Sequence, residues 1–588
     1  MSEEGFNEAQ KKYLQGVTAG LHIARGIPGL SGGKLSPDEI HAQARIRTQA
    51  EGGELCAQEL AKAEKNPNDL WDEMLANAAK GVYPKGDDVF LYKSSGLFYV
   101  APNQDSYMCR LRMPNGIFSS HHVRGVADLA ETYGGGYTHV TTRANLQIRE
   151  IGARDPIHVL MGLHELGIIN RGAGADNVRN ITGGPLAGID PQELIDTRPL
   201  AREMHHYILN HRELYGLPRK FNIAFDGGGR ISALEGTNDI GFAAVLPRPD
   251  SPLPQKPYFR LALGGITGHE DFARDTGVML KPEECVAVAG AALRVFIANG
   301  DRTDRDKARL KYLLDRWGFD KFMAEVQKHL PFTLRRFPRH RCEPRAPVHK
   351  HGHIGVHPQR QKDKHYIGVV LPVGKLSCEQ MRGIARLSDQ YGDGLIRCTV
   401  WQNVILAGID SGDVESARKE IEQLGLDHSA SSLRAGLVAC TGSFGCRFAN
   451  ADTKTHAMAI AAHLEDKLEG KLKLEQPLNI HVTGCKNSCA QHYVGDIGLL
   501  GCKVDIGGDE AVDGYHVYLG GGYEHEEGIG RELRQSVPAD EVPVYLEAVL
   551  RAYLERRRNA DESFVAFVRR HEIAELKEML AHNQAEAA

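Results

Sequence analysis

The chain has 588 residues and a formal net charge of −5, with 42% hydrophobic residues, 25% charged residues and a mean hydropathy of −0.35. This composition is that of an ordinary globular protein and excludes disordered, collagen-like and disulfide-scaffold classes. The negative charge gives no electrostatic reason to expect nucleic acid or an anionic membrane as a partner. At about 150 residues per domain, the length predicts about four domains.

The amino terminus is acidic and carries neither a signal-peptide nor a transit-peptide pattern, which predicts a cytoplasmic protein. Helical periodicity from Ser36 to Ala79 predicts a helical N-terminal extension within residues 1–90. No apolar run reaches the roughly 18 residues that a membrane helix needs. The nearest one, Val286 to Ala298, is interrupted by Arg294 and predicts a buried helix.

The chain contains an internal repeat, because a segment that begins at Met113 aligns without gaps with one that begins at Leu371. Each copy runs from an apolar strand through a Pro-Gly turn into an amphipathic helix and a Gly-bounded strand, which is typical of α/β sandwich units. We therefore predict two similar halves with pseudo-two-fold symmetry. The matched residues are Pro114, Gly116, Arg124, Gly125, Tyr133, Gly134, Gly136, Asn145 and Ile151, which align with Pro372, Gly374, Arg382, Gly383, Tyr391, Gly392, Gly394, Asn403 and Ile409.

Two further segments differ from the repeat in composition. Residues 331–364, between the copies, are rich in Pro, His and Arg and predict an extended linker. Residues 542–588 are charged and have a helical pattern, which predicts a helical tail.

Four of the 11 cysteines form a compact pattern in the second copy. Cys440 and Cys446 form a C-x5-C pair in ACTGSFGC, and Cys485 and Cys489 form a C-x3-C pair in VTGCKNSC. Four thiolates on Gly-flanked turns can supply the ligands of an iron–sulfur cluster. Zinc fits less well, because structural zinc pairs usually keep two to four residues between ligands. Buried cysteines that bind no metal are the remaining alternative.

The first copy carries cations at positions where the second copy has uncharged residues. At strand ends, Arg and Lys are costly unless they meet anions, so the set predicts a polyanionic ligand or an anionic substrate. The alternative is that each is an ordinary exposed side chain. These residues are Arg110, Arg112, Arg143, Arg149, Arg179 and Lys220.

Together with the runs DNVRN and LPRKFN, the cysteine pattern and the duplication resemble the sirohaem-containing nitrite and sulfite reductase family over residues 90 to 570. The resemblance implies an α/β (α+β) fold with two internally duplicated ferredoxin-like halves and two larger sirohaem and cluster domains. The ferredoxin-like halves are expected at 91–167 and 365–426. The larger domains are expected at 168–330, on the basic substrate side, and at 427–588, on the cluster side.

The resemblance also implies the cofactors and their ligands. Cys440, Cys446, Cys485 and Cys489 would bind a [4Fe-4S] cluster, and Cys489 would also bridge to the iron of sirohaem. Three catalytic cations would bind the substrate anion and deliver protons: Arg110, Arg179 and Lys220. The eight carboxylates of sirohaem would meet basic and amide side chains, and one asparagine between the cluster cysteines would contact the macrocycle. The sirohaem-binding set is Arg112, Arg143, Gln147, Arg149, Arg309, Lys311 and Asn487.

One position distinguishes the substrates within this family. Members that resemble sulfite reductases have Lys at the second position after the LPRK lysine, whereas those that resemble nitrite reductases have Asn, here Asn222. Because sulfite carries more negative charge than nitrite at neutral pH, a second ammonium helps sulfite and a neutral amide suffices for nitrite. We therefore predict six-electron reduction of nitrite to ammonia. We also expect the protein to be a monomer. Ferredoxin-dependent sulfite reduction is the alternative, and a redox sensor without turnover is a third.

Electrons must come from outside this chain, because no G-x-G-x-x-G follows a predicted strand and no flavin or nicotinamide module is visible. By resemblance, the donor is a small ferredoxin. Ferredoxins are acidic and this chain is net negative, so docking needs a local basic patch. The candidates are Arg335, Arg336, Arg339 and Arg341 in the linker, or Arg556 to Arg558 in the tail.

Overall fold

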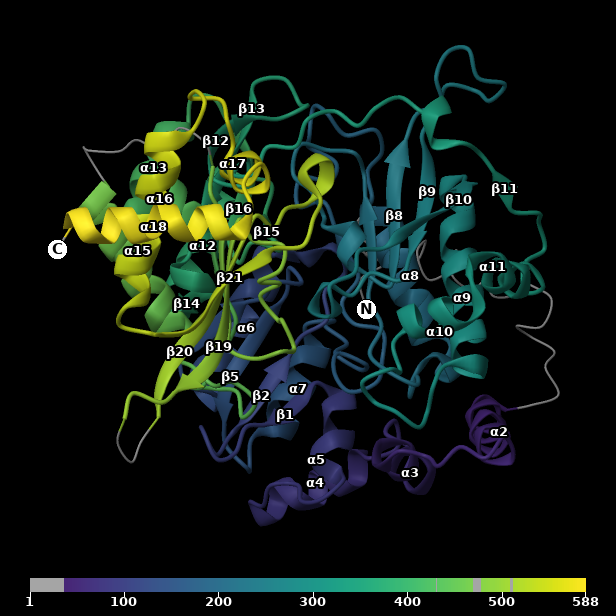
Figure 1. The fold of residues 1–588 in the computed structure, drawn as a ribbon. Coiled ribbons are helices and arrows are strands. Elements are labelled where there is room, and N and C mark those ends of the chain that lie inside the picture. Colours follow the sequence, from purple (N-terminus) through teal and green to yellow (C-terminus); the bar gives the residue numbers. More distant parts are fainter. Residues whose placement is uncertain (1–35, 430, 469–476, 508–510, 588) are drawn as a thin grey trace.

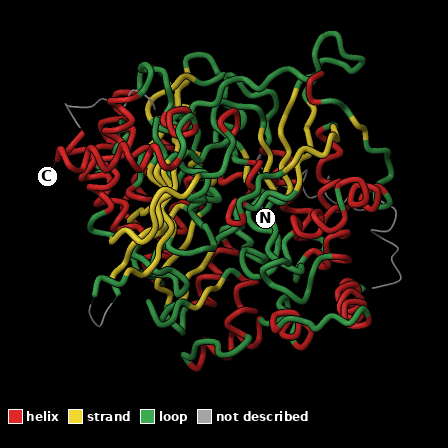
Figure 2. The backbone as a smooth tube through the Cα atoms, in the orientation of Figure 1, coloured by secondary structure: helices red, strands yellow, loops and turns green. Residues whose placement is uncertain are grey.

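The computed structural model describes residues 36–429, 431–468, 477–507 and 511–587, so the part of the predicted extension before residue 36 lies outside the described residues. The described residues form four sheets, and helices pack against them (Figure 1). Figure 2 shows the strands gathered in two groups, with helices along their outer sides. The mixed α+β class predicted from the sequence is confirmed.

Two five-stranded sheets contain the repeated segments, and each takes an edge strand from the other copy. Strand β14 of the second copy pairs with β4 of the first, and β3 of the first pairs with β15 of the second. The copies are therefore joined by main-chain hydrogen bonds. The first sheet has the order β1 (Leu97–Tyr99), β2 (Tyr107–Arg110), β5 (Leu146–Ile151), β4 (Tyr137–Val140), β14 (Lys375–Ser377), and the second β12 (Gly355–Pro358), β13 (Lys364–Val369), β16 (Val404–Asp410), β15 (Leu395–Cys398), β3 (Ile117–Ser119).

Each exchanged strand leads directly into a helix of the same length and the same start signal. Helix α6 (Ser120–Tyr133) begins after a capping box at Ser119, and α12 (Cys378–Tyr391) begins after one at Ser377. In this motif the serine side chain and the residue three positions later satisfy two otherwise unpaired backbone N–H groups. The two helices pack against each other, and Arg382 of α12 pairs with Asp128 and Glu131 of α6. Helix α7 (Pro156–Glu165) packs on α6, and α13 (Val414–Gln423) packs on α12.

Each half also has a larger sheet with three parallel strands followed by antiparallel ones. In the first, β6, β7 and β8 are parallel; in the second, β17, β18 and β19 are parallel. Loops that follow neighbouring parallel strands leave the same edge of a sheet, so each half has one edge suited to a site. The orders are β11 (Arg335–Arg336), β10 (Arg274–Leu280), β9 (Tyr258–Leu263), β8 (Ile240–Val245), β7 (Ile223–Asp226), β6 (Thr182–Gly183), and β17 (Leu437–Ala439), β18 (Ile480–Thr483), β19 (Ile497–Val504), β20 (Val512–Leu519), β21 (Arg531–Pro538).

Helices cover these larger sheets. In α9 (Cys285–Asn299) almost every side chain is buried, which agrees with the buried helix predicted there. Both ends of the predicted linker 331–364 are built into sheets, because β11 pairs with β10 and β12 pairs with β13. The other covering helices are α8 (Arg198–Leu209), α10 (Leu310–Trp317) and α11 (Phe319–Gln327) in the first half, and α14 (Ser432–Ala435), α15 (Thr453–Leu468), α16 (Val542–Arg556), α17 (Phe564–Arg569) and α18 (Ile573–Ala587) in the second.

The described part of the N-terminal extension consists of α2 (Pro37–Ala50), α3 (Ala57–Glu64), α4 (Trp71–Lys80) and α5 (Asp88–Leu91), drawn in purple at the base of Figure 1. A capping box at Ser36 starts α2, and the left-handed Gly81 ends α4. Helix α2 packs on α9, so the extension is attached to the first half. Within the described residues, no helix has the length and apolar character needed to span a bilayer.

The contact between the copies is sensitive to one glycine. Gly374 precedes the exchanged strand β14, has a φ of 81°, and an added Cβ would lie 2.6 Å from the Val140 carbonyl oxygen of the other copy. We expect Gly374→Ala to lower the free energy of unfolding by about 1–3 kcal/mol, because the left-handed backbone and the clash are both unfavourable. Gly412→Ala, at a position with open space, is the control. Equal thermal unfolding midpoints for the two variants would contradict the prediction.

Candidate cluster and anion site

Two neighbouring parallel strands present the cysteine turns. Strand β17 ends at Ala439, directly before Cys440, and β18 ends at Thr483, two residues before Cys485. Because the strands are parallel, their carboxyl ends bring the two turns together. The contact is direct, since the backbone N–H of Gly484 donates to the Cys440 thiol at 3.2 Å.

The four thiols influence one another. Burial, together with the neighbouring Cys489, raises the pKa of the Cys440 thiol to about 11. Burial likewise raises the pKa of Cys446 and of Cys485, and Cys489 adds to both shifts. Cys489 is therefore the common neighbour of the other three, and it is the most exposed of the set.

The spacing of the thiols favours a polynuclear group over a single ion. Thiolates that share one tetrahedral zinc, with Zn–S bonds of about 2.3 Å, lie about 3.8 Å apart. In the part of the chain that the structure describes, no three thiols lie within 4.8 Å of one another. The arrangement therefore does not match a single tetrahedral zinc, and the assignment of these four cysteines to a cluster stays a prediction.

The first copy supports these turns from the opposite side. The Thr142 hydroxyl donates to the Cys489 carbonyl at 2.9 Å, and an Arg149 guanidinium nitrogen donates to the Gly445 carbonyl at 3.0 Å. The Asn103 amide donates to the Ser443 carbonyl at 2.5 Å. The cysteine turns are therefore held between the two copies.

Three cations gather beside Cys489. Arg110 ends β2, Arg179 follows Val178, and Lys220 precedes Phe221; Val178 and Phe221 form a parallel bridge. The pKa values of Arg110 and Lys220 both respond to the Cys489 thiolate, and that of Arg179 responds to Arg110. Burial lowers the pKa of Lys220 to about 7, with Arg309 and Arg219 contributing.

None of these three cations forms an ion pair with a carboxylate among the described residues. Arg179 instead donates to the carbonyls of Ala173 and Ala175, at 2.7 and 2.6 Å. Arg110 lies over the Phe98 ring at 4.4 Å. Desolvated positive charge without a carboxylate partner is unfavourable, so the arrangement favours an anionic ligand at this place.

Several buried polar groups near the cations lack part of their hydrogen bonding. Arg112, only 1% exposed, donates to the Arg171 carbonyl at 2.9 Å, but two of its nitrogens have no partner. Arg143 donates to the Asn180 carbonyl and to the Asn238 side chain, and its Nε is unpaired. Unpaired buried donors are costly. A macrocycle with many carboxylates would satisfy them, so the residues present fit sirohaem.

Other predicted sirohaem ligands have different surroundings. Arg309 forms a buried ion pair with Asp239 at 2.7 Å, and Lys311 pairs with Asp271 and Asp315 at 2.7 and 2.6 Å. Both cations therefore already have carboxylate partners within the protein, and their contact with sirohaem stays a prediction.

The two predicted amide ligands lie at the cation set and at the cysteines. Gln147 is opposite Arg110 in the β2–β5 ladder, and directly opposed residues share a face of the sheet. Asn487 is exposed and donates to the Cys485 thiol at 3.5 Å.

Two cations of this region were missed from the sequence. Burial, with the neighbouring Arg447, Arg179 and Arg110, lowers the pKa of Lys93 to about 8, which places Lys93 in the same basic group. Lys93 lies before the repeat, so comparing the two copies could not reveal it. Arg447 directly follows Cys446, and an arginine beside a cluster ligand is a signal that could have been used.

Comparison with known proteins gives the family. Residues 174–334 and 430–586 match the nitrite and sulphite reductase 4Fe-4S domain, and residues 99–160 and 357–424 match the nitrite/sulfite reductase ferredoxin-like half domain. The chain belongs to the nitrite and sulfite reductase family. This confirms the predicted family, its duplicated ferredoxin-like halves and its cofactors, a [4Fe-4S] cluster and sirohaem.

Relatives within this family are similar over most of their length. A ferredoxin–nitrite reductase of Leptolyngbya laminosa is 37% identical over 465 residues, which cover 77% of this chain and 88% of the relative. The chloroplastic ferredoxin–nitrite reductase of Spinacia oleracea is 31% identical over 524 residues, 86% of each chain. The solved structure of the NirA protein of Mycobacterium tuberculosis superposes with a TM-score of 0.82 at 26% identity, covering 90% of this chain and 99% of that one.

The central place of Cys489 can be tested by removing its thiol. We expect Cys489→Ala, purified without oxygen, to contain far less iron and acid-labile sulfide than the parent protein, because a cluster with three cysteine ligands is held poorly. Cys502→Ala is the matched control, since Cys502 lies in β19, outside both cysteine turns. Full iron and sulfide content in the Cys489 variant would contradict the ligand assignment.

Proposed function

We propose that this protein reduces nitrite to ammonia by six electrons drawn from reduced ferredoxin. The observation that carries the proposal is the group of desolvated cations without carboxylate partners, placed beside the one exposed cysteine of the cluster set. The relatives named ferredoxin–nitrite reductase agree with it.

The cofactors have defined places in this proposal. Cys440, Cys446, Cys485 and Cys489 would hold the cluster. When bound, the cluster and sirohaem supply the electrons and the iron at which the anion is reduced. The sirohaem carboxylates and ring would be held by Arg112, Arg143, Gln147, Arg149 and Asn487. Arg309 and Lys311 would contribute less, because both already pair with carboxylates of the protein.

Arg110, Arg179 and Lys220 would act on the substrate itself. The two guanidinium groups keep their charge and would bind and orient the anion. Lys220 has a pKa near 7, so its ammonium can release a proton at neutral pH and take up another. Hydrogen bonds to the Ala173 and Ala175 carbonyls fix the orientation of the Arg179 guanidinium.

Asn222 favours nitrite over sulfite. Asn222 lies two residues after Lys220 and directly before β7. The Asn222 side-chain oxygen is buried without a partner, and its backbone N–H donates to Asp239 at 2.7 Å. A neutral amide at this place leaves less positive charge for the more highly charged sulfite.

The surface that receives ferredoxin, a monomeric state and a cytoplasmic location stay predictions. Arg335 and Arg336 lie on β11, at the outer edge of the six-stranded sheet, on the other side of Figure 1 from β19 and β20. Arg336 also pairs with Asp320. Arg556 and Arg558 are exposed and belong to the half that carries the cysteines. We therefore favour the tail arginines for docking.

The function is tested by comparing both anions. With reduced ferredoxin or methyl viologen, we expect ammonia from nitrite at a kcat/KM at least about tenfold above that for sulfide formation from sulfite, because every tenfold preference needs only about 1.4 kcal/mol of differential transition-state binding. A higher kcat/KM for sulfite would reject nitrite as the substrate.

The role of Asn222 gives a separate prediction. We expect Asn222→Lys to lower kcat/KM for nitrite and raise it for sulfite, because a second ammonium beside Lys220 attracts the more highly charged anion. Asn210→Lys adds the same charge at the exposed end of α8 and is the control. If the ratio of the two kcat/KM values is the same in both variants, Asn222 does not select the substrate.

A further inference from the structure

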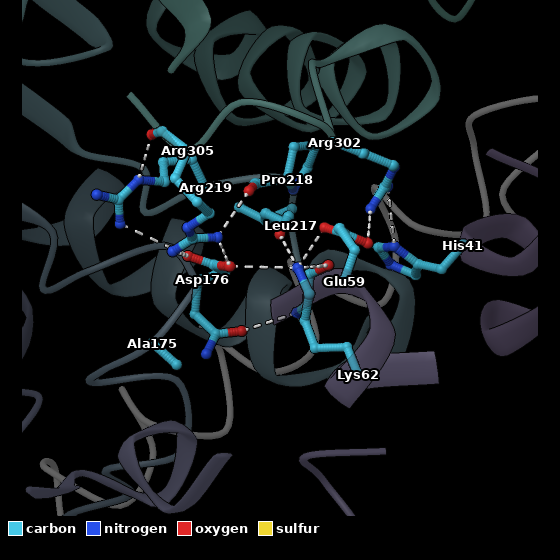
Figure 3. A network of polar contacts seen from close by, with 12 residues as sticks. His41, Glu59, Lys62, Ala175, Asp176, Leu217, Pro218, Arg219, Arg302 and Arg305 are labelled. Carbon is cyan, nitrogen blue, oxygen red and sulfur yellow. Dashed lines mark hydrogen bonds and ion pairs between the residues drawn. The ribbon is translucent and has the colours of Figure 1, made fainter. Parts of the chain in front are cut away.

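A lysine of the N-terminal extension reaches both segments that carry substrate-binding cations. Lys62 lies on α3, which precedes all residues matched by the family's domains. It is only 6% exposed, and its ammonium donates to the Asp176 carboxylate at 3.2 Å and to the Leu217 carbonyl at 2.7 Å (Figure 3). Its third strong partner is Glu59 of the same helix, at 2.5 Å.

Asp176 and Leu217 each lie three residues before one of the proposed catalytic cations. Asp176 is three residues before Arg179 in DNVRN, and Leu217 is three residues before Lys220 in LPRK. The segments are also paired with each other: the Leu217 N–H donates to the Asp176 carbonyl at 2.8 Å. One ammonium therefore joins the starts of both cation-bearing segments.

Lys62 belongs to a larger buried network, shown in Figure 3. Asp176 also forms an ion pair with Arg305 at 2.5 Å and lies 3.9 Å from Arg219. Glu59 forms an ion pair with Arg302 at 2.6 Å. Burial raises the pKa of Asp176, but Lys62 and Arg305 outweigh this and lower it to about 2, so the carboxylate stays charged. Asp176 is 1% exposed and Glu59 is fully buried.

Stability alone does not account for this network. Replacing a buried ion pair by apolar residues of similar volume is often neutral or stabilising, because desolvation of the charges offsets their attraction. What a buried charge supplies is fixed geometry, since each partner has one low-energy position. Here the geometry concerns the two segments that hold Arg179 and Lys220.

We propose that Lys62 is a positioning residue for the anion site: it sets the separation of Arg179 and Lys220, so the N-terminal extension controls the affinity for the substrate anion. The inference rests on the proposed function for the identity of that anion. Lys62 has no role in chemistry itself, because its ammonium is fully used by Glu59, Asp176 and Leu217.

The test replaces Lys62 by methionine, which keeps the length and removes the charge. The matched control is Lys65→Met: Lys65 caps the same helix, is 40% exposed at its side chain, and pairs with Glu73 and Asp88 at the surface. Both holoenzymes are compared with the parent for iron, sulfide and sirohaem content. Nitrite binding is measured by optical titration of the oxidised enzyme, and hydrogen exchange is followed in the peptides 173–180 and 215–222.

In Lys62→Met we expect a nitrite Kd and KM raised about tenfold with kcat changed less than about threefold, because misplaced binding groups weaken ground-state and transition-state binding alike. Exchange should accelerate in both peptides together. Lys65→Met should leave all of these unchanged. Unchanged nitrite affinity and unchanged exchange in a folded, fully loaded Lys62→Met protein would overturn the proposal.

A second variant covers the case in which Lys62→Met does not fold. Lys62→Arg keeps the charge but changes the reach and the shape of the donor. We expect it to fold with full cofactor content and to raise the nitrite Kd; parental affinity and exchange would overturn the proposal. If the parent enzyme fails to reduce nitrite, the proposed function is wrong, whereas the exchange measurement still decides whether Lys62 orders the two segments.

Discussion

Buried positive charge that has no carboxylate partner among the described residues is the constraint on which this structure depends. Arg110, Arg179 and Lys220 are desolvated, and within the described residues none of them forms an ion pair with a carboxylate. The Cys489 thiol acts on Arg110 and Lys220, whereas the Asp176 carboxylate acts on Arg179 from beyond ion-pair distance. Such a group is unfavourable by itself, because burial penalises each charge and the cations repel one another. The surrounding protein must therefore hold it together. The fold does so from three directions: the first copy, the cysteine turns of the second copy, and the N-terminal extension.

The two copies share backbone contacts at equivalent positions but carry different side chains at the site. The Asn222 N–H donates to Asp239 in the first half, and the Asn479 N–H donates to Asp496 in the second. These carboxylates pair with Arg309 and Lys350, respectively.

At the position equivalent to Arg143, however, the second copy has Trp401. This tryptophan is 2% exposed and packs against His353 and Tyr523. At this position an aromatic ring in one copy takes the place of a cation in the other.

The sequence revealed what depends on local pattern and on comparison of the copies. The cysteine spacing and the cations at divergent positions were visible because each stands out against its aligned partner. Strand exchange was not visible, since the pattern of β3 or β14 shows that a strand forms but not which copy it joins. Arg309 and Lys311 were expected at sirohaem, but their pairing with Asp239, Asp271 and Asp315 depends on tertiary contacts that a charge pattern does not encode. Lys62 and Lys93 were missed because they precede the repeat and have no aligned partner.

Strand exchange explains how two copies can share one site. The cations come from the first half and the thiols from the second, so the chemistry requires that their relative position be fixed. A face-to-face contact between two domains allows small sliding motions, whereas a shared sheet fixes the register by main-chain hydrogen bonds. Strand β14 ends one residue before α12 begins, and β3 ends one residue before α6 begins, so each exchanged strand also fixes a helix of the interface. The side-chain contacts of Thr142 and Arg149 with the cysteine turns then act between parts that are already in register.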